Sequence, residues 1–245
     1  MTTRQPVKVG PMRDRVLVVG GTRGTGLLIV RALLARGYPV RALARDPGSA
    51  GQRLGAAVEV IRGDITKPDT LPPALREVTH VVFTAGVHSG RFAREDFVKL
   101  TDYEGVTNTL SAARGAGLRG RFIYMNALGI TTPSLAAVLL NWWKRNTLVW
   151  RRRAEEAIRA SGLDYTIIRA GFLVNRPSGR RAVVVGQEAF PLSPRYRIAR
   201  EDVADAFVEA LAHPRASRAT FDIVWGKGPR REGWSALMDR LEPDA

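Results

Sequence analysis

The sequence predicts an α/β fold in which helices cover both faces of a mostly parallel β-sheet. Two observations lead to this prediction. Short apolar segments of strand length alternate with helix-like segments along almost all of the 245 residues. The first apolar segment also runs directly into a cluster of glycines, and a helix-like segment follows it. Because no internal repeat or long linker interrupts the chain, we expect one domain over residues 14–245, preceded by a flexible basic tail at residues 1–13.

The glycine cluster is the most informative stretch. Residues 15–19 are typical of a strand buried on both faces, and residues 24–36 are typical of a helix. Gly20, Gly24 and Gly26 have the spacing G-x-x-x-G-x-G, which differs from the usual dinucleotide fingerprint G-x-G-x-x-G. Glycines at such a turn let the backbone approach a ligand, and the N-terminus of the helix attracts a phosphate. The residues expected to hold that phosphate are Gly20, Gly21, Thr22, Arg23, Gly24, Thr25 and Gly26.

The remaining elements alternate in the same way. We expect further strands at residues 39–44, 58–62, 80–86, 121–125, 165–169, 182–185 and 220–224, and further helices at residues 71–77, 96–115, 151–161, 201–211 and 233–241. The apolar, aromatic segment 131–150 gives no clear assignment. This pattern predicts a Rossmann-type, doubly wound sheet with a small C-terminal portion on the substrate side. Ligands of such sheets bind outside the carboxyl ends of the strands.

The second strand ends at a basic residue. In dinucleotide sites an acidic residue at this point holds the ribose hydroxyls of NAD, whereas an arginine accommodates the additional phosphate of NADP. Arg45 occupies the position, and Arg23 lies within the glycine cluster. Asp46 is the competing signal for NAD, although Pro47 after it indicates a turn residue. We therefore predict that NADP(H) is preferred over NAD(H).

Composition excludes several classes of protein. The chain has no cysteine, which excludes disulfides and thiolate catalysis, and its three histidines lack metal-ligand spacing, so we expect no metal. No apolar run is long enough to span a membrane and no apolar leader begins the chain, so we expect a cytoplasmic protein. The net charge of +15 is spread over the chain and is not interleaved with aromatic residues, which argues against a nucleic-acid partner.

Several short segments, taken in order, carry a family resemblance over roughly residues 15–225. They are residues 16–26, 44–46, 63–65, 84–86, 102–105 with Asn108, 153–156, 161–169 and 198–204. In these segments the chain resembles an atypical (extended-type) short-chain dehydrogenase/reductase of the NAD(P)H-binding, NmrA-like branch.

The resemblance implies positions around a cofactor. It places Asp64 and Ile65 beside the adenine. It places Thr84, Ala85 and Gly86 along the adenosine ribose and pyrophosphate. The residues that it places near the nicotinamide and substrate are Asn126, Ala127, Ala170, Gly171 and Phe172.

The chain also departs from active reductases of this family. Those enzymes use a Tyr-x-x-x-Lys pair with a serine, and the tyrosine donates a proton to the substrate. Aligned on residues 154–156, the tyrosine position falls on Thr147, the lysine position on Arg151 and the serine position on Asn126. Arg151 can still hydrogen-bond a ribose but is a poor proton donor. We therefore assign no catalytic residue.

Other residues have a functional and a structural interpretation. Tyr103, Tyr124 and Tyr165 are candidates for the missing tyrosine, but each lies in a segment typical of a core. Among the histidines, we single out His88 as the candidate for substrate contact. The carboxylates that we interpret as helix starts or surface groups are Glu95, Asp96, Glu155 and Glu156.

The tryptophans of segment 131–150 have three interpretations. Trp142, Trp143 and Trp150 fit an apolar substrate pocket or lid. With Lys144 and Arg145 they also fit a peripheral membrane contact. The third interpretation is a subdomain core or an oligomer interface.

The sequence leaves more than one function open. The leading one is an NADPH-dependent oxidoreductase that acts on an apolar or aromatic small molecule. The alternative is a non-enzymatic NADP(H)-binding redox sensor or assembly factor with a regulatory protein partner, which the loss of the Tyr, Lys and Ser positions favours. An RNA-binding relative that uses the charge of +15 ranks third.

Overall fold

The computed structural model describes residues 14–87, 94–132, 135–143, 146–230 and 232–244. The expected tail at residues 1–13, His88 and the pair Lys144 and Arg145 lie outside the described residues. No helix in the described part of the chain has the length and apolar character needed to cross a membrane.

A central sheet of eight strands forms the middle layer, in the order β3-β2-β1-β4-β5-β6-β10-β8. Its strands are β1 (Val16–Val19), β2 (Val40–Ala44), β3 (Val58–Arg62), β4 (His80–Phe83), β5 (Arg121–Ala127), β6 (Asp164–Ala170), β8 (Val183–Gly186) and β10 (Ala219–Trp225). All neighbours are parallel except β8, which runs antiparallel to β10. The expected Rossmann-type, mostly parallel sheet is confirmed.

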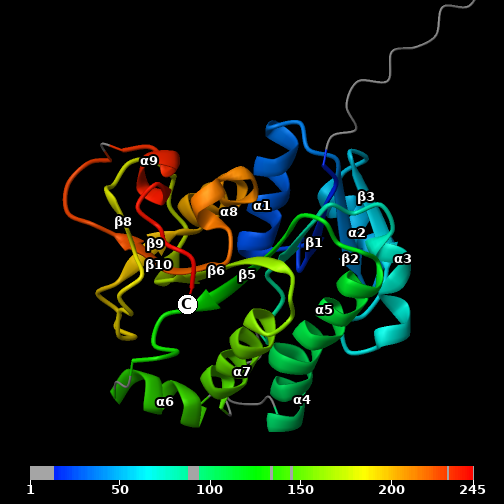
Figure 1. Ribbon diagram of the computed structural model, residues 1–245, viewed down its shortest axis with the longest axis horizontal. Helices are drawn as coiled ribbons and strands as arrows, with labels where there is room; N and C mark the ends of the chain where they lie inside the picture. Colours follow the sequence, from blue (N-terminus) through cyan, green and yellow to red (C-terminus); the bar gives the residue numbers. More distant parts are fainter. Residues whose placement is uncertain (1–13, 88–93, 133–134, 144–145, 231, 245) are drawn as a thin grey trace, which may run out of the picture.

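Helices cover both faces of this sheet, as Figure 1 shows. On one face lie α1 (Gly24–Ala35) and α8 (Arg200–Ala212), which contact each other, with α9 (Trp234–Met238) beside α8. On the other face lie α3 (Pro72–Leu75), α5 (Gly105–Gly115) and α7 (Thr147–Arg159). Alternation along β1 explains the two cores: Val16 and Val18 pack in one cluster, and Leu17 and Val19 in the other.

Several elements differ from the expected ones. The expected helix 96–115 is divided into α4 (Glu95–Lys99), a π-helical turn at Leu100–Glu104 and α5. Segment 131–150 contains α6 (Leu135–Trp143) and the start of α7, which begins one turn earlier than expected. The elements without a sequence prediction are α2 (Pro47–Leu54), the pair β7 (Phe172–Val174) and β9 (Arg197–Ala199), and the 3-10 turns Pro68–Thr70 and Pro214–Ala216.

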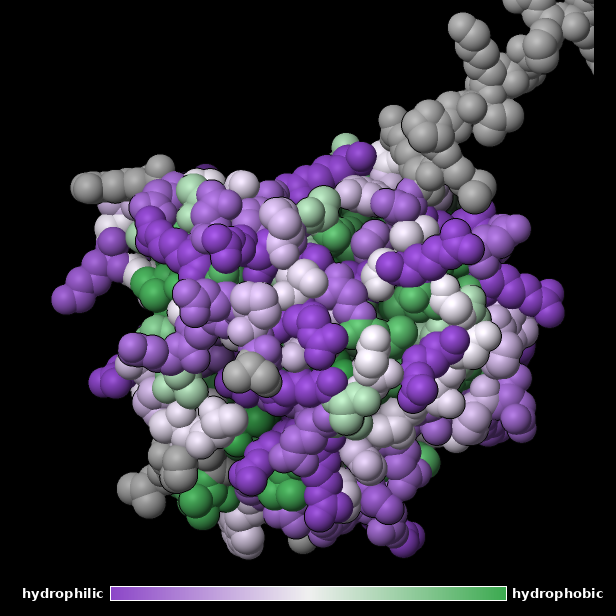
Figure 2. All heavy atoms as spheres, in the orientation of Figure 1, coloured by the Kyte–Doolittle hydropathy of each residue, from purple (hydrophilic) through white to green (hydrophobic). Residues whose placement is uncertain are grey.

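The face of the molecule drawn in Figure 2 carries both hydrophilic and apolar residues. In Figure 2 hydrophilic residues cover most of the visible face, and an apolar patch lies at the lower left over α6. This patch agrees with the exposure of Val138, Leu139 and Trp142, the last of which is 81% exposed. Trp142 therefore does not belong to a core.

Candidate cofactor site

The glycine turn between β1 and α1 has the conformation that its sequence predicts. Gly20 and Gly24 have positive φ angles of 90° and 56°, which residues with a Cβ rarely adopt. A Cβ on Gly20 would lie 2.7 Å from the backbone nitrogen of Ala85, and a Cβ on Gly26 would collide with the carbonyl oxygen of Gly20. Glycine is therefore required at Gly20 and Gly26 by close packing of β1, α1 and the end of β4.

The N-terminus of α1 lies at this turn without a cap. No side chain caps the helix and its first turn contains no acidic residue, so its first N–H groups and the positive end of its dipole have no counterpart in the described chain. Thr25 is buried, and its hydroxyl lacks a hydrogen-bond partner there. These are features of a phosphate-binding turn, so the residues present fit the pyrophosphate of a dinucleotide.

The end of β2 presents Arg45, which is exposed. Arg23 in the glycine turn is exposed as well. Asp46 caps α2 instead: its carboxylate accepts hydrogen bonds from the backbone N–H groups of Gly48 and Ser49 at 3.1 and 3.4 Å. Asp46 is thus a turn residue engaged with its own helix, while both arginines face solvent.

The residues after β3 and β4 form the next part of the edge. The Asp64 carboxylate accepts hydrogen bonds from the N–H and the hydroxyl of Thr66 at 3.0 and 2.9 Å. The carbonyl of Ile65 accepts a 2.9 Å hydrogen bond from the side chain of Asn108. The hydroxyl of Thr84 donates to the carbonyl of Val19 at 3.1 Å, which joins the end of β4 to β1.

Arg151 reaches this edge from α7. Its Nη2 lies 2.5 Å from the point that a Cβ on Gly86 would occupy. Its Nε lies 3.4 Å from Oδ2 of Asp102, a buried residue of the π-helical turn. The same oxygen accepts a 2.6 Å hydrogen bond from Thr147, and Val87 N–H donates to Oδ1 at 3.0 Å. Burial works against the charge of Arg151, but Asp102 and Tyr124 together outweigh burial and raise the pKa of Arg151.

Asn126 belongs to a buried polar network. Its amide donates to Glu155 at 2.8 Å, and Arg169 donates to both oxygens of Glu155 at 2.8 and 2.6 Å. Glu155 is 1% exposed, so its interpretation as a surface carboxylate is wrong: tertiary packing brings Arg169 and Asn126 over it. Glu156, the next residue, lies on the surface as expected, since its pair with Arg152 is exposed.

The residues expected on the substrate side lie at the end of β6 and just after it. Ala170 is buried, Phe172 is 41% exposed and a Cβ on Gly171 would lie 2.7 Å from the carbonyl oxygen of Tyr196. A small apolar cluster packs nearby in the same C-terminal part of the fold. Its buried members are Leu128, Ile130, Leu148, Leu192 and Val224, with Leu140, Phe190 and Tyr196 against them. Segment 131–150 thus contributes Leu140 and Leu148 to a small apolar cluster that it shares with residues of other segments.

The candidate tyrosines are structural. Tyr124 and Tyr165 are buried, and burial raises the pKa of both. Tyr165 donates a 2.9 Å hydrogen bond to Asp244. Tyr103 lies against Trp150, with ring centroids 6.0 Å apart.

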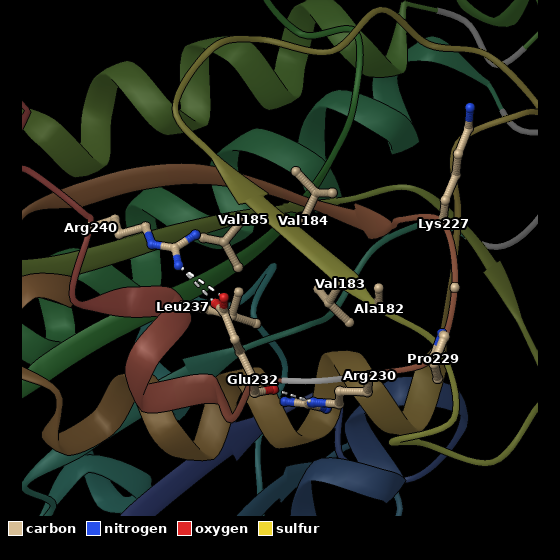
Figure 3. A pocket seen from close by; sticks show the side chains of 11 residues that line it. Ala182, Val183, Val184, Val185, Lys227, Pro229, Arg230, Glu232, Leu237 and Arg240 are labelled. Atoms are coloured by element: carbon tan, nitrogen blue, oxygen red, sulfur yellow. Dashed lines mark hydrogen bonds and ion pairs between the residues drawn. The ribbon is translucent and has the colours of Figure 1, made fainter.

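A cavity of ≈ 410 Å³ lies elsewhere, between the edge strand β8 and α9. Val183 and Leu237 contribute to its lining, and Arg240 at its rim pairs with Glu232 at 2.9 Å (Figure 3). None of the expected cofactor residues lines this cavity. The candidate site is therefore the carboxyl edge of the sheet and not this cavity.

Strand order explains why the expected residues gather. The neighbours β2, β1, β4, β5 and β6 are parallel, so Arg45, the glycine turn, residues 84–86, Asn126 and residues 170–172 follow one another along one edge. A family model described as NAD(P)H-binding matches residues 20–214. The chain belongs to this NAD(P)H-binding family.

Its relatives include reductases and assembly factors. Sanguinarine reductase of Eschscholzia californica is 29% identical over 92% of this chain and 95% of its own length. The photosystem II assembly factor Ycf39 of Synechocystis is 27% identical over 93% of this chain and 67% of its own length. A solved structure from Bacillus halodurans, described as an NAD-dependent epimerase/dehydratase, has a TM-score of 0.76 and 26% identity, covering 93% of this chain and all of that one. The resemblance to atypical short-chain dehydrogenases/reductases is confirmed.

The sequence placed Asp102 and Glu155 in segments that carry the family resemblance, but it predicted no buried role for either carboxylate. The sequence did contain a sign that Asp102 is buried. Val98, Asp102, Val106 and Leu110 recur every four residues, and the three apolar ones are buried. A carboxylate on an apolar helix face needs a partner. No comparable signal marked Glu155, which lies in the charged run from Arg151 to Glu156.

Proposed function

We propose that this protein binds NADPH along the carboxyl edge of its sheet and uses it to reduce an apolar or aromatic small molecule. The observation that carries the proposal is the N-terminus of α1, which no side chain caps. It lies at the turn in which Gly20 and Gly24 have positive φ angles. The proposed contacts are the glycine turn 20–26, Arg45, Asp64, Ile65, residues 84–86, Asn126, Arg151 and residues 170–172. At this site NADPH would supply a hydride, while the chain binds and orients both reactants.

The preference for NADPH rests on Arg23 and Arg45. Both are exposed, and two guanidinium groups near one ribose favour a 2′-phosphate through charge-assisted hydrogen bonds. Asp46, the competing group, is engaged at the cap of α2. Titration with NADPH and NADH tests this preference. Tighter binding of NADPH that Arg45→Ala abolishes supports it, whereas equal binding of NADH that Arg45→Ala leaves unchanged contradicts it.

A second candidate function is a non-enzymatic NADP(H)-binding sensor or assembly factor with a protein partner. The observation that favours it is Thr147, which occupies the expected tyrosine position and donates its hydroxyl to Asp102. NADPH oxidation with panels of quinones, flavins and aldehydes separates the two functions. Steady turnover supports the reductase, whereas tight NADPH binding without oxidation supports the sensor.

Three further statements stay predictions from the sequence: a cytoplasmic location, a contact of the tryptophan segment with a membrane surface, and the low rank of RNA as a partner. Retention on RNA that falls with salt would favour the RNA-binding function instead.

A further inference from the structure

The cavity between β8 and α9 lies apart from the proposed cofactor edge and has no part in the proposed function. Its volume of ≈ 410 Å³ falls within the range of about 300–1,000 Å³ that is usual for small-molecule sites. None of the residues assigned to NADPH contributes to its lining. The residues that do line it therefore determine which class of molecule it fits.

The apolar wall of the cavity comes from β8 and α9. Alternate residues of a strand point to the same face, and on β8 these are Val183 and Val185. Both belong with Leu237 of α9 to one apolar cluster, and all three line the cavity (Figure 3). This wall can shield the hydrocarbon part of a ligand from water.

The loop after β10 forms a second wall and is held to β8 through its backbone. Gly226 N–H donates to the carbonyl of Ala182 at 2.8 Å, and Ala182 N–H donates to the carbonyl of Gly228 at 2.9 Å. An added Cβ on Gly228 would meet no described atom within 4 Å, so space remains beside the loop. The cavity is therefore preformed, as small-molecule sites usually are.

Cations outnumber carboxylates in the described lining. Lys227, Arg230 and Arg240 contribute to it, against the single carboxylate of Glu232. Arg240 is directed toward β8 (Figure 3), and its Nη2 donates to both oxygens of Glu232 at 3.1 and 2.9 Å. Its Nε and Nη1 have no partner in the part of the chain that the structure describes. The net charge of +15 adds a general attraction for anions.

Arg230 differs from Arg240 because its surroundings already use its charge. Its Nε donates to the carbonyl of Glu232 at 2.9 Å, and its Nη1 lies 3.5 Å from Oδ1 of the buried Asp202. Its guanidinium carbon also lies 4.7 Å from the centre of the Trp234 ring. Arg230 is only 14% exposed, whereas Arg240 is 69% exposed. Arg240 is therefore the guanidinium with donors to spare for a ligand.

We propose that this cavity is a second ligand site, which binds a small organic carboxylate. The carboxylate pairs with Arg240 through charge-assisted hydrogen bonds, and the apolar chain or ring lies against Val183, Val185 and Leu237. This inference does not depend on the proposed NADPH site, because the two sites share no residue.

The experiment uses octanoate and 1-octanol as probes, since they carry hydrocarbon chains of similar length and differ in charge. Calorimetric titration of the full chain measures both. We expect octanoate to bind with a Kd about tenfold lower than that of 1-octanol, as for a charge-assisted contact. NADPH should not displace octanoate. Equal binding of the two probes, no binding of octanoate, or its displacement by NADPH overturns the inference.

Two variants locate the probe. We expect Arg240→Gln to raise the Kd of octanoate by about tenfold and to leave that of 1-octanol within about twofold. Arg215→Gln is the matched control, since it removes the same charge from an exposed residue outside the cavity lining, and it leaves both values unchanged. Val185→Trp should fill the cavity and abolish binding of both probes.

Other results with these variants contradict the site. Octanoate binding that survives Val185→Trp places the probe elsewhere and overturns the inference. Equal weakening of both probes in Arg240→Gln also overturns it, because the contact with the carboxylate is then not the cause. If thermal melting shows that Val185→Trp does not fold, Arg240→Gln carries the test, since its side chain is mostly exposed.

Discussion

Glu155 shows at the scale of one residue how a charge is accommodated in this fold. It is 1% exposed and lies between the amide of Asn126 and the guanidinium of Arg169, with Arg159 at 3.2 Å. An isolated buried charge costs far more free energy than a paired one. The two arginines and the amide therefore determine whether this carboxylate stabilises the protein.

Removing the charge of Glu155 tests this account. We expect Glu155→Gln to lower the free energy of unfolding by about 1.5–3 kcal/mol, because the buried Arg169 loses its nearer carboxylate and keeps only Asp222, at 3.8 Å, as a charged partner among the described residues. Chemical denaturation measures the change. Glu156→Gln is the matched control, since Glu156 is 60% exposed, and it changes stability by no more than about 0.5 kcal/mol. Equal effects of the two variants contradict the account.

Asp222 gives the protein a pH-dependent stability. Burial raises its pKa from 3.8 to about 6, against the opposing hydrogen bond from Phe190 N–H. A carboxyl group whose pKa is higher in the folded state binds protons more tightly there, so its contribution to stability is present at low pH and is lost as the pH rises through about 6.

We therefore expect the pH dependence of stability to change in Asp222→Asn. As the pH falls from about 8 to about 5, the wild type gains about 1–2 kcal/mol relative to this variant, which cannot titrate at residue 222. Unfolding curves at the two pH values measure the difference. A stability gap that is the same at both values contradicts the assigned pKa.

At the scale of an element, α1 depends on glycine at its N-terminus. Gly26 packs against the carbonyl of Gly20 and lies 2.7 Å, measured from the position of an added Cβ, from the Thr84 hydroxyl. Gly51 in α2 has no atom within 4 Å of an added Cβ. A side chain at residue 26 would therefore collide with the turn, whereas a side chain at residue 51 has room.

Alanine substitution at the two positions should change stability in opposite directions. We expect Gly26→Ala to destabilise the protein by about 1–3 kcal/mol through overpacking, and to weaken NADPH binding by displacing the turn. Gly51→Ala, the matched control, should stabilise it by about 0.5–1 kcal/mol through helix propensity. Thermal unfolding and NADPH titration check both. Tolerance of alanine at residue 26 with unchanged stability would show that the close approach is not needed.

At the scale of the whole molecule, Asp244 connects elements that are far apart in the sequence. The Asp244 carboxylate accepts hydrogen bonds from Tyr165 at 2.9 Å, from Thr220 N–H at 2.9 Å and from Arg159 at 3.2 Å. These three donors come from β6, β10 and α7. One side chain near the C-terminus thus joins the sheet to a helix on its face.

Loss of the Asp244 carboxylate should affect the free energy of unfolding and the pKa of Tyr165. We expect Asp244→Ala to lower the free energy of unfolding by about 1.5–3 kcal/mol, because its buried donors lose their acceptor. Tyr165, whose pKa burial and Asp244 raise to about 12, should titrate at a lower pH but still above its ordinary value. Denaturation and an ultraviolet pH titration measure these changes. Glu242→Ala is the control, since among the described residues Glu242 hydrogen-bonds only through its backbone, to Gln187. A shift of the Tyr165 pKa in that variant would contradict the assignment.

Much of the fold could be predicted from the sequence. Apolar runs of strand length, glycines at the first turn and helix-like segments in alternation all report local preferences, and they predicted the strands of the parallel sheet. The same order predicted that residues 20–26, 45, 64–65 and 84–86 would lie at one edge, because parallel strands end on the same side. The helix α2 and the short strands β7 and β9 were missed, since they are brief and weakly patterned.

The sequence by itself determined the layered α/β architecture and the glycine turn between β1 and α1, because both follow from side-chain periodicity and from glycine conformations that act over a few residues. Only the tertiary structure decided the environments of Asp102 and Glu155. The partners of Asp102, Thr147 and Arg151, are 45 and 49 residues away, and Asn126 and Arg169 reach Glu155 from separate strands. The free energy of a charge depends on the burial and the donors that surround it, and packing of distant segments creates both.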